Sequence, residues 1–494
     1  MIHGKLHKLV QHGKPCSTIP LRFRQLTVLS YPVRHIQSTC HSHNSSAPSI
    51  SPHTDILSYL MDRGLIAQTT NTTKLKQLLS SGKQITMYLG IDPTSPSLHI
   101  GHLLPLLVLK YLQLYIHCKP IIVIGGATAT IGDPSGRSSE RQPLSIDTIQ
   151  HNIQSITPTL QQLFCFDPDQ PNCAVIVNNY NWYQNMSFLP FISDIGRHFK
   201  INTMLQRDSV KQRLLSDNDT SMSFTEFTYQ LLQSYDYLYL YQRQQCVVQV
   251  GGSDQWGNIT AGIQLIHKLH PPPSTDDHLV YGMTVPLLTT SAGEKFGKSA
   301  GNAIWLNKSM TSSFQLYQYF LSIGDSNVYK YLKLFTQLND SALQEYNRSS
   351  DNKLGLHKLA YCVTELIHGT DEANQAVNAT NALFNNRNDE IYDFSSLAHN
   401  DIISAFNGVP QYNMIQSQFI NSSIQQLCID IHACISKAEA RRLISSGGLY
   451  INNKRINDDK RSMQFNDIIN GVCIIRTGKT KQYLIIIKTD TTNA

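Results

Sequence analysis

The sequence predicts an α/β protein with a Rossmann-like parallel-sheet domain, an α-helical domain after it, and a small α+β domain at the end. Three observations support this fold class. Short apolar runs alternate with helical stretches up to residue 325, helical periodicity fills residues 326–410, and "SKAEARRLISSGGLYINNKRI" leads into β-like runs. Alternating strands and helices predict a parallel sheet, because parallel strands need long crossover connections that are usually helical.

The first part of the chain shows a strand–helix–strand pattern. "KQITMYLGIDP" predicts a buried strand, a helix follows from about His99 to His117, and "PIIVIGGATATIGDPSG" predicts a strand that ends in a glycine-rich turn. "AVIVNNYNW" and "CVVQVGGSDQWGN" predict further strands. Such units are right-handed, and open sheets of this kind bind ligands beyond the carboxyl ends of their strands. We therefore expect functional residues in the segments that follow these strands.

Length and composition exclude several classes of protein. A chain of 494 residues is long enough for two or three domains. The sequence holds no run of about 18 apolar residues that could span a bilayer. Its 10 cysteines form no CxxC or Cys/His cluster, so we expect no metal site, no disulfide framework and a reducing compartment.

Residues 1–54 differ in composition from the rest of the chain. They hold six basic residues and no acidic one, and these six charges account for the formal net charge of +6. An acid-free, Ser- and His-rich leader without a continuous apolar core is typical of a mitochondrial transit peptide. We interpret residues 1–54 as a transit peptide or disordered leader, which predicts localisation in the mitochondrial matrix; a basic tail without a targeting role is the alternative.

The stretch "SLHIGHLLPLL" places His99 and His102 around Gly101, where the first predicted helix begins. A helix N-terminus presents free N–H groups and a partial positive charge, which suit a phosphate. Glycine lets a nucleotide approach the backbone closely, and the two imidazoles can donate hydrogen bonds to phosphate oxygens. Surface histidines at a helix start are also common, so this motif alone is a weak signal.

A second motif, "EKFGKSAGN", carries Lys295 and Lys298 on a glycine-containing loop. Two ammonium groups on a flexible loop can close on a departing pyrophosphate, whose charge develops in the transition state. An HxGH motif after the first strand together with KxxKS after the last strand is a strong pair. The two motifs predict chemistry on a nucleotide.

The stretch "YQLLQSYD" places three polar side chains on one helix face, because Tyr229, Gln233 and Asp236 stand at positions i, i+4 and i+7. A plain amphipathic helix would carry apolar residues there, so this face is expected to meet a ligand. Tyr88, on the first strand, is expected to point into the same crevice. A purely structural buried Asp–Tyr pair is the alternative.

The sequence resembles the class I aminoacyl-tRNA synthetases, and among them the tyrosyl-tRNA synthetases of bacterial and mitochondrial type. The resemblance rests on "YLGIDPTSPSLHIGHL", "GGATATIGDPSGR", "SFTEFTYQLLQSYD", "VGGSDQWGNIT" and "EKFGKSAGNAIWL", and it spans nearly the whole chain after the leader. It implies activation of tyrosine with ATP and Mg²⁺, transfer of tyrosine to the 3′ end of tRNA(Tyr), no tightly bound cofactor, and a homodimer.

The resemblance also implies a tyrosine site. Tyr88 and Asp236 would take the phenolic hydroxyl, and this pair would reject phenylalanine because its binding would leave both groups buried without a partner. The ammonium group would meet Asp133, Tyr229 and Gln233, the carboxylate would lie near Gln255, and Gly90 and Asp92 complete the implied site.

An ATP site is implied as well. Many bacterial relatives carry lysine where this chain has Arg137, but both are permanent cations and arginine can bind phosphate bidentately. Catalysis would need no side-chain nucleophile, only positioning and stabilisation of phosphate charge. The implied nucleotide-binding residues are Thr94, His99, Gly101, His102, Arg137, Arg141, Gly252, Asp254, Lys295, Phe296, Gly297, Lys298 and Ser299, of which His99, His102, Lys295 and Lys298 would be catalytic.

The end of the chain resembles a small S-four-like RNA-binding fold. Its predicted helix carries Lys437, Arg441 and Arg442, which we expect to contact tRNA phosphates; a merely solvated basic helix face is the alternative. The sequence thus predicts a leader (1–54), a catalytic domain (55–325), a helical domain that approaches the anticodon stem (326–410), and a linker with the S-four-like domain (411–494).

Three other functions share some of these sequence features. A tryptophanyl synthetase shares both signatures, but Tyr88, Asp236 and "GGSDQWGN" favour tyrosine. A non-catalytic RNA-binding or splicing factor would be expected to lose His99, His102 or the loop lysines, although an additional role on other structured RNA stays compatible with the sequence. A small nucleotidyltransferase would lack the polar helix face and the basic segment at the end of the chain.

Overall fold

The computed structural model describes residues 55–489, except for residues 138, 215–221, 273, 275–278, 289–297, 300–301, 325–326, 349–351, 385–394, 396, 407–408 and 479–480. The predicted leader therefore lies outside the described residues, as do Lys295, Phe296 and Gly297 of the second signature. For Lys298 and Ser299 only the backbone is described. Among the described helices, none is long and apolar enough to cross a bilayer.

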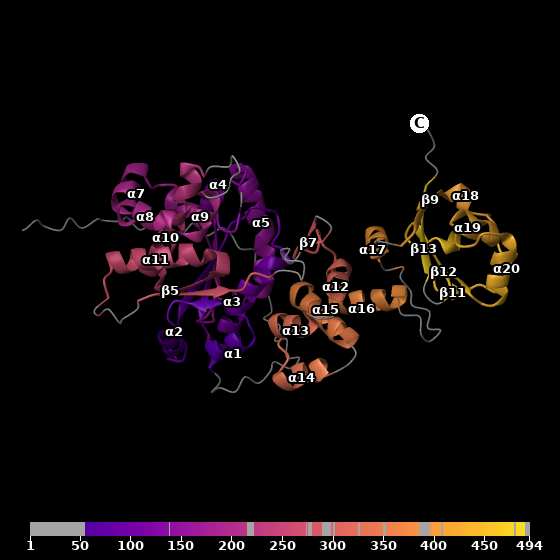
Figure 1. The fold of residues 1–494 in the computed structure, drawn as a ribbon, viewed down its shortest axis with the longest axis horizontal. Helices are drawn as coiled ribbons and strands as arrows, with labels where there is room; N and C mark the ends of the chain where they lie inside the picture. Colours follow the sequence, from indigo (N-terminus) through magenta and orange to yellow (C-terminus); the bar gives the residue numbers. More distant parts are fainter. Residues whose placement is uncertain are drawn as a thin grey trace, which may run out of the picture. The chain divides into compact units, whose positions relative to one another are not determined.

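The catalytic domain is built on a six-stranded sheet with the order β1-β6-β5-β2-β3-β4 (Figure 1). All neighbouring strands are parallel except β1 and β6, which pair antiparallel. The strand order reverses at β2, which lies between β3 and β5. The strands are β1 (Gln68–Thr69), β2 (Thr86–Ile91), β3 (Lys119–Ile124), β4 (Val175–Asn178), β5 (Cys246–Gly252) and β6 (Tyr281–Val285).

Helices connect these strands, and the predicted α/β class is confirmed. The helix expected from about His99 is a short 3₁₀ turn, η1 (Ile100–His102), followed by α3. The α-helices are α1 (Ile56–Asp62), α2 (Thr72–Leu79), α3 (Leu103–Ile116), α4 (Thr128–Ile131), α5 (Ile146–Leu163), α6 (Tyr180–Tyr183), α7 (Phe188–Asp194), α8 (Ile201–Leu205), α9 (Asp208–Leu214), α10 (Phe224–Gln244) and α11 (Trp256–Leu269).

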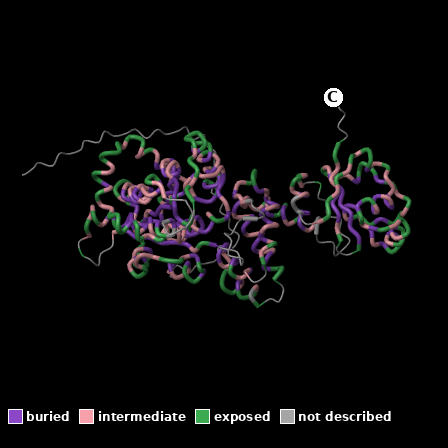
Figure 2. The backbone as a smooth tube through the Cα atoms, turned by 45° about the horizontal axis from the view of Figure 1, so that its top comes forward, coloured by how far each residue is buried: buried purple, intermediate pink, exposed green. Residues whose placement is uncertain are grey.

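The two faces of the sheet have different roles. Alternate side chains of β2, namely Met87, Leu89 and Ile91, pack in one apolar core with α3 and α1. Tyr88 points to the opposite face and packs with residues of α10 and α11, among them Tyr237. Figure 2 shows that buried residues concentrate along the central strands. Because successive side chains of a strand point to opposite faces of the sheet, Tyr88 lies on the face that the polar helix α10 covers.

A buried arginine ties the start of the domain to a distant helix. Arg63, which follows α1, is 3% exposed and donates to four backbone carbonyls at the C-terminus of α13 (Val328–Phe335). Its Nε lies 2.8 Å from the Lys333 oxygen and its Nη1 lies 2.9 Å from the Leu338 oxygen. The last carbonyls of a helix have no partner within the helix, so this guanidinium satisfies them.

The helical domain predicted for residues 326–410 is present, with one difference at its start. Helix α12 (Ser313–Leu321) packs against α15 and α16, although the predicted boundary leaves it in the catalytic domain. Its sequence "SFQLYQYFL" is helical and apolar, and Phe320 is fully buried. The other helices are α13, α14 (Asp340–Arg348), α15 (Asn352–His368), α16 (Thr370–Phe384) and α17 (His399–Ala405).

The last domain is a five-stranded sheet with the order β11-β10-β12-β13-β9, covered by short helices. Strand β9 pairs parallel with β13, so residues expected to form a linker belong to the sheet instead. The expected helix with the basic residues is present, and β-strands follow it as expected. The elements are β9 (Gln411–Ile415), α18 (Gln416–Phe419), α19 (Ile424–Asp430), α20 (Lys437–Ser445), β10 (Leu449–Ile451), β11 (Lys454–Arg455), β12 (Val472–Thr477) and β13 (Lys481–Lys488).

Candidate active site

The first signature forms a turn that fixes both histidines. The Nδ1 atom of His99 accepts a hydrogen bond from the Gly101 amide at 3.1 Å, and the Nδ1 atom of His102 accepts one from the His99 amide at 3.2 Å. A ring nitrogen that accepts carries no proton, so the neutral rings hold their proton on Nε2. Burial and the neighbouring His99 lower the pKa of His102 to about 3, so this ring is neutral at pH 7.

The backbone of the second signature returns beside the first. Strands β7 (Lys298–Ser299) and β8 (Asn302–Ala303) form a hairpin in which Lys298 pairs with Ala303. The next residue, Ile304, accepts a hydrogen bond from the Ile100 amide at 2.9 Å, and His99 forms a β-bridge with Trp305. The backbone that follows the second signature, at Ile304 and Trp305, therefore lies against the first signature at His99 and Ile100.

The polar face of α10 carries a buried carboxylate, Asp236, that lies near the buried Tyr88 of β2. Asp236 is 4% exposed and accepts hydrogen bonds from Asn179 Nδ2 at 3.1 Å and Trp182 Nε1 at 2.8 Å. The hydroxyl of Tyr88 is buried and has no hydrogen-bond partner among the described residues. The Tyr88 ring lies 5.2 Å from that of Tyr237, the residue next to Asp236. An unpartnered buried hydroxyl beside a carboxylate is the arrangement that a second hydroxyl can complete.

Burial strongly affects the ionisation of this carboxyl group. Desolvation raises the pKa of Asp236 to about 7, although the hydrogen bonds from Asn179 and Trp182 oppose this shift. Burial and the nearby Asp236 raise the pKa of the Tyr88 hydroxyl well above its ordinary value, so Tyr88 keeps its proton. In mild acid, therefore, Asp236 takes up a proton and no longer acts as an ionised acceptor, whereas the Tyr88 hydroxyl keeps its proton.

A second carboxylate lies farther along the same helix face. The Tyr229 hydroxyl donates to Asp92 Oδ2 at 2.9 Å, and Thr128 donates to Asp92 Oδ1 at 2.7 Å. Burial, with a smaller contribution from the nearby Asp133, raises the pKa of Asp92 to about 6. Tyr229 therefore joins α10 to Asp92, the residue after β2; that this helix face meets a ligand stays a prediction.

Asp133, Gln233 and Gln255 come together around a residue that the sequence analysis missed. Gln255 Nε2 donates to Asp133 Oδ2 at 2.6 Å. Asn258 donates to the Oε1 atoms of Gln233 at 3.0 Å and Gln255 at 3.2 Å, and it lies 3.4 Å from Asp133 Oδ1. The predicted tyrosine-site side chains thus fall into two hydrogen-bonded groups: Asp92 and Tyr229 form one, and Asp133, Gln233 and Gln255 meet around Asn258 in the other.

Among the described residues predicted to bind the nucleotide, Thr94 lies after β2, Arg137 and Arg141 lie between α4 and α5, and Gly252 and Asp254 lie at the end of β5. Gly101 and Arg137 are exposed, and Thr94 and Arg141 are partly exposed. A Cβ atom at Gly252 would lie 2.6 Å from Asp254 Oδ1, so a larger residue there would require the Asp254 side chain to move. A Cβ atom at Gly90 would point into open space on the α10 face of the sheet.

Three further residues of the site escaped the sequence analysis. Asn179 and Trp182 hold Asp236, and Thr128 holds Asp92. Asn179 follows the strand β4, so the rule that ligands lie beyond the carboxyl ends of strands could have found it. Trp182 and Thr128 lie on short helices whose positions no spacing in the sequence reveals.

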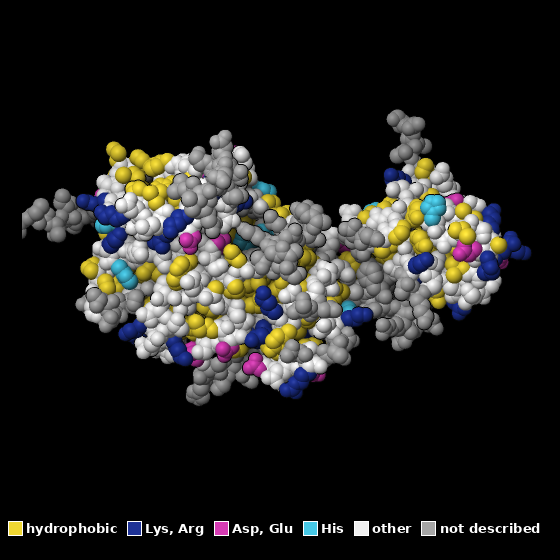
Figure 3. Space-filling view, in the orientation of Figure 1, with side chains coloured by type: hydrophobic (Ala, Val, Ile, Leu, Met, Phe, Trp, Pro, Cys, Tyr) yellow, Lys and Arg dark blue, Asp and Glu magenta, His cyan; other side chains and the backbone are white. Residues whose placement is uncertain are grey.

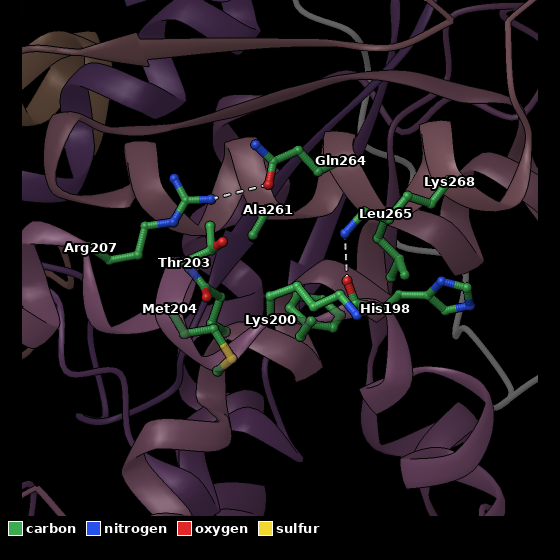
Figure 4. A pocket seen from close by; sticks show the side chains of 11 residues that line it. His198, Lys200, Thr203, Met204, Arg207, Ala261, Gln264, Leu265 and Lys268 are labelled. Carbon is green, nitrogen blue, oxygen red and sulfur yellow. Dashed lines mark hydrogen bonds between the residues drawn. The ribbon is translucent and has the colours of Figure 1, made fainter.

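A separate hollow of about 200 Å³ lies among α8, α10 and α11 (Figure 4). Arg207 reaches Gln264 at 3.4 Å across it, and Lys268 donates to the His198 oxygen at 2.5 Å. Its eleven lining residues include Lys200, Arg207 and Lys268 but no carboxylate. None of the predicted tyrosine or ATP residues lines this hollow.

The predicted RNA-contacting residues lie on α20, away from the pocket in sequence. Lys437, Arg441 and Arg442 are all exposed. Arg441 forms an exposed ion pair with Asp459 at 3.4 Å. Ser436 caps the helix by accepting a hydrogen bond from the Glu439 amide at 3.2 Å. The helix therefore presents cations to solvent on a well-defined scaffold.

Comparison with known families agrees with this geometry. Residues 80–385 match the model of the tRNA synthetases class I (W and Y), and residues 401–486 match the tyrosine–tRNA ligase SYY-like C-terminal domain. The chain therefore belongs to the class I aminoacyl-tRNA synthetases.

Within this class the similarity is to tyrosine enzymes. The tyrosine–tRNA ligase of Hamiltonella defensa is 40% identical over 440 residues, which cover 88% of this chain and 99% of the relative. That of Bacteroides thetaiotaomicron is 39% identical over 417 residues, which cover 83% and 95%. The chain is a tyrosyl-tRNA synthetase, a tyrosine–tRNA ligase.

Two solved structures support the same conclusion. The C-terminally truncated mitochondrial tyrosyl-tRNA synthetase of Aspergillus nidulans matches with 34% identity and a TM-score of 0.59, over 67% of this chain and 94% of that chain. The enzyme of the same type from Coccidioides posadasii matches with 36% identity and a TM-score of 0.56, over 65% and 91%.

Proposed function

We propose that the pocket under α10 is the tyrosine site of this ligase. The observation that carries the proposal is the unpartnered, buried Tyr88 hydroxyl beside the Asp236 carboxylate. A phenolic hydroxyl can donate to Asp236 and accept from Tyr88, which satisfies both groups at once. The ammonium group would then lie toward Asp92, Asp133 and Tyr229.

Adenylate formation follows from this placement. The tyrosine carboxylate attacks the α-phosphorus of ATP, which enters as its magnesium complex, and the bond from that phosphorus to the β-bridging oxygen breaks. His99 and His102 donate from Nε2 to the phosphate oxygens as they gain charge, and Lys295 and Lys298 neutralise the leaving pyrophosphate. A hydroxyl of the terminal tRNA adenosine then attacks the tyrosyl carbonyl and releases AMP. The protein supplies orientation and charge, with no covalent intermediate on a side chain.

Replacing Asp236 by alanine is expected to lower kcat/KM for tyrosine by roughly 30- to 100-fold, because the phenol loses an ionised acceptor in a buried site. The KM for ATP should change little. Tyrosine-dependent exchange of pyrophosphate into ATP, measured with tyrosine and with phenylalanine, checks this. An unchanged preference for tyrosine over phenylalanine would contradict the proposed site.

The pH dependence of kcat/KM for tyrosine tests the same site in a second way. Because burial raises the pKa of Asp236 to about 7, kcat/KM for tyrosine should fall as the pH drops through 7 and the carboxylate takes up a proton. In Asp236→Asn this limb should vanish and only a limb near pH 6, due to Asp92, should remain. An identical profile in both proteins would show that Asp236 does not touch the substrate.

We also propose that α20 contacts tRNA phosphates through Lys437, Arg441 and Arg442. Replacing Arg441 and Arg442 by alanine should weaken tRNA binding and reduce its salt dependence by up to about two counterions' worth of slope. Pyrophosphate exchange needs no tRNA and should be unchanged, so exchange and tyrosylation of tRNA are compared in the same double variant. Equal losses in both reactions would mean that the domain supports folding of the catalytic part.

We propose a homodimer formed through α7 and α8. Hydrophobic side chains gather over these helices (Figure 3), among them Phe188, Leu189 and Ile201, which are 65%, 76% and 57% exposed. Exposed apolar patches of this kind are typical of subunit interfaces. Analytical ultracentrifugation of Leu189→Asp should show monomers if this surface forms the interface, and unchanged dimers would contradict it.

We propose, finally, that the enzyme acts in the mitochondrial matrix. Support comes from the acid-free basic leader and from the likeness to two fungal mitochondrial enzymes. Residues 1–54 fused to a reporter protein should direct it into mitochondria. A reporter that stays in the cytosol would contradict the proposal.

A further inference from the structure

Asn258 occupies the centre of the network at the ammonium end of the pocket. It is the third residue of α11 and is 5% exposed. Its Nδ2 atom lies within hydrogen-bond distance of four side-chain oxygens: Gln233 Oε1 at 3.0 Å, Gln255 Oε1 at 3.2 Å, Asp133 Oδ1 at 3.4 Å and Ser135 Oγ at 3.4 Å. One amide nitrogen with two protons is therefore shared among groups from three separate segments of the chain.

The contacts of Asn258 differ from those of two other buried amides, Asn152 and Gln113. Asn152 donates to the Pro93 backbone oxygen at 2.9 Å, and Gln113 donates to the backbone oxygens of Cys165 and Asn172 at 3.0 and 2.9 Å. Those amides hold main-chain segments together. All four acceptors near Asn258 Nδ2 are side chains, and three of them belong to the proposed tyrosine site. This pattern indicates a role in the site beyond holding the fold.

The network has a direction because each amide has a donor end and an acceptor end. Gln255 Oε1 accepts from Asn258, so its Nε2 faces away and donates to Asp133 Oδ2 at 2.6 Å. Asn258, Gln255 and Asp133 thus form a closed ring, and the Ser135 amide adds a donor to Asp133 Oδ1 at 3.0 Å. Both carboxylate oxygens of Asp133 therefore receive donors, which fix the orientation of this side chain.

We propose that Asn258 is a positioning residue for tyrosine. It fixes the amide orientation of Gln233 and Gln255 and holds Asp133 where an ammonium group can reach it. The inference rests on the proposed tyrosine site and goes beyond it, because Asn258 acts through its neighbours and carries a donor that no other residue in the ring can replace. The four acceptors near Asn258 Nδ2 include none of the predicted ATP residues, so the KM for ATP should change much less.

The test exchanges the donor of Asn258 for an acceptor of the same shape. Asn258→Asp removes both N–H donors and places a second carboxylate beside Asp133, so the KM for tyrosine should rise by on the order of 10- to 100-fold. The KM for ATP should stay within about 2-fold. Asn258→Ser keeps one donor and should lie between Asn258→Asp and the wild type. Pyrophosphate exchange with each substrate varied in turn gives both constants.

Gln113→Glu is the matched control, because it makes the same amide-to-carboxylate change at a buried position of the same domain. It should lower the melting temperature and leave the KM for tyrosine unchanged. Equal effects of Asn258→Asp and Gln113→Glu on the KM for tyrosine, or a parallel rise in the KM for ATP, would overturn the inference. If Asn258→Asp does not fold, an unchanged KM for tyrosine in Asn258→Ser overturns it instead.

The same assay separates this inference from the proposed function. If Asp236→Ala impairs the use of tyrosine and the Asn258 variants do not, the tyrosine site stands and only the role of Asn258 fails. If Asp236→Ala has no effect, the tyrosine site itself is placed wrongly.

Discussion

Replacing His102 by alanine is expected to slow tyrosyl-adenylate formation by about 10²- to 10³-fold, the usual loss when one preorganised donor to a developing charge is removed. The turn at η1 holds the ring with Nδ1 facing the His99 amide at 3.2 Å, so Nε2–H points outward as a donor. Because the phosphates gain charge only during attack, binding of ATP in the ground state should weaken far less. Single-turnover measurement of adenylate formation, beside equilibrium binding of ATP, checks both quantities.

His151→Ala provides the control, because His151 is exposed on α5 and makes no contact with the site in the described part of the chain. It should leave both quantities unchanged. A His102→Ala protein with a raised KM for ATP and normal turnover would show that the ring contributes only to ground-state binding. The same comparison applies to His99.

Replacing Arg63 by methionine is expected to lower the free energy of unfolding by about 3 kcal/mol or more. The backbone oxygens of Lys333, Thr336 and Leu338 would lose the guanidinium donor, and methionine can fill the space without satisfying them; the Leu332 oxygen keeps the Thr336 amide and hydroxyl as donors. Urea unfolding followed by circular dichroism gives the change. Arg63→Lys keeps the positive charge but not the planar guanidinium, so it should lower the free energy of unfolding less than Arg63→Met does.

A loss below about 1 kcal/mol in Arg63→Met would mean that water replaces the guanidinium at these carbonyls. Pyrophosphate exchange at low temperature should remain, because Arg63 lies outside the tyrosine and ATP sites. A variant that folds stably and yet fails to form adenylate would contradict this purely structural role.

The strands and the polar helix could be predicted because they depend on local patterns. Tyr229, Gln233 and Asp236 lie on successive turns of α10, so their spacing alone shows that they share one helix face. The signatures beside η1 and β7 were found for the same reason. In each case the information lies within a few residues of sequence. The structure confirms the predicted helix at α10, whereas the described residues of the second signature belong to the hairpin β7–β8 instead of the expected loop.

The residues that connect such elements could not be found in this way. Asn258 meets Asp133, 125 positions away, and Asn179 meets Asp236, 57 positions away. Nothing in either local stretch distinguishes these asparagines from surface residues. The start of the helical bundle at α12 was missed likewise, because an apolar helix next to a sheet domain fits either neighbour until its packing partners are known.

The contact between Arg63 and α13 sets a constraint on the order in which the molecule assembles. Arg63 and its acceptor Lys333 are 270 residues apart, and β1 pairs with β6 across a similar gap. At about 5–20 residues per second, a ribosome would need roughly 15–50 s to deliver α13 after Arg63 has been made. During that time Ile56, Leu57 and Leu60 of α1 would lack part of the core that finally covers them. Helix α1 is thus the first described element to be synthesised but among the last to complete its packing. While the chain is incomplete, its apolar face is available to chaperones.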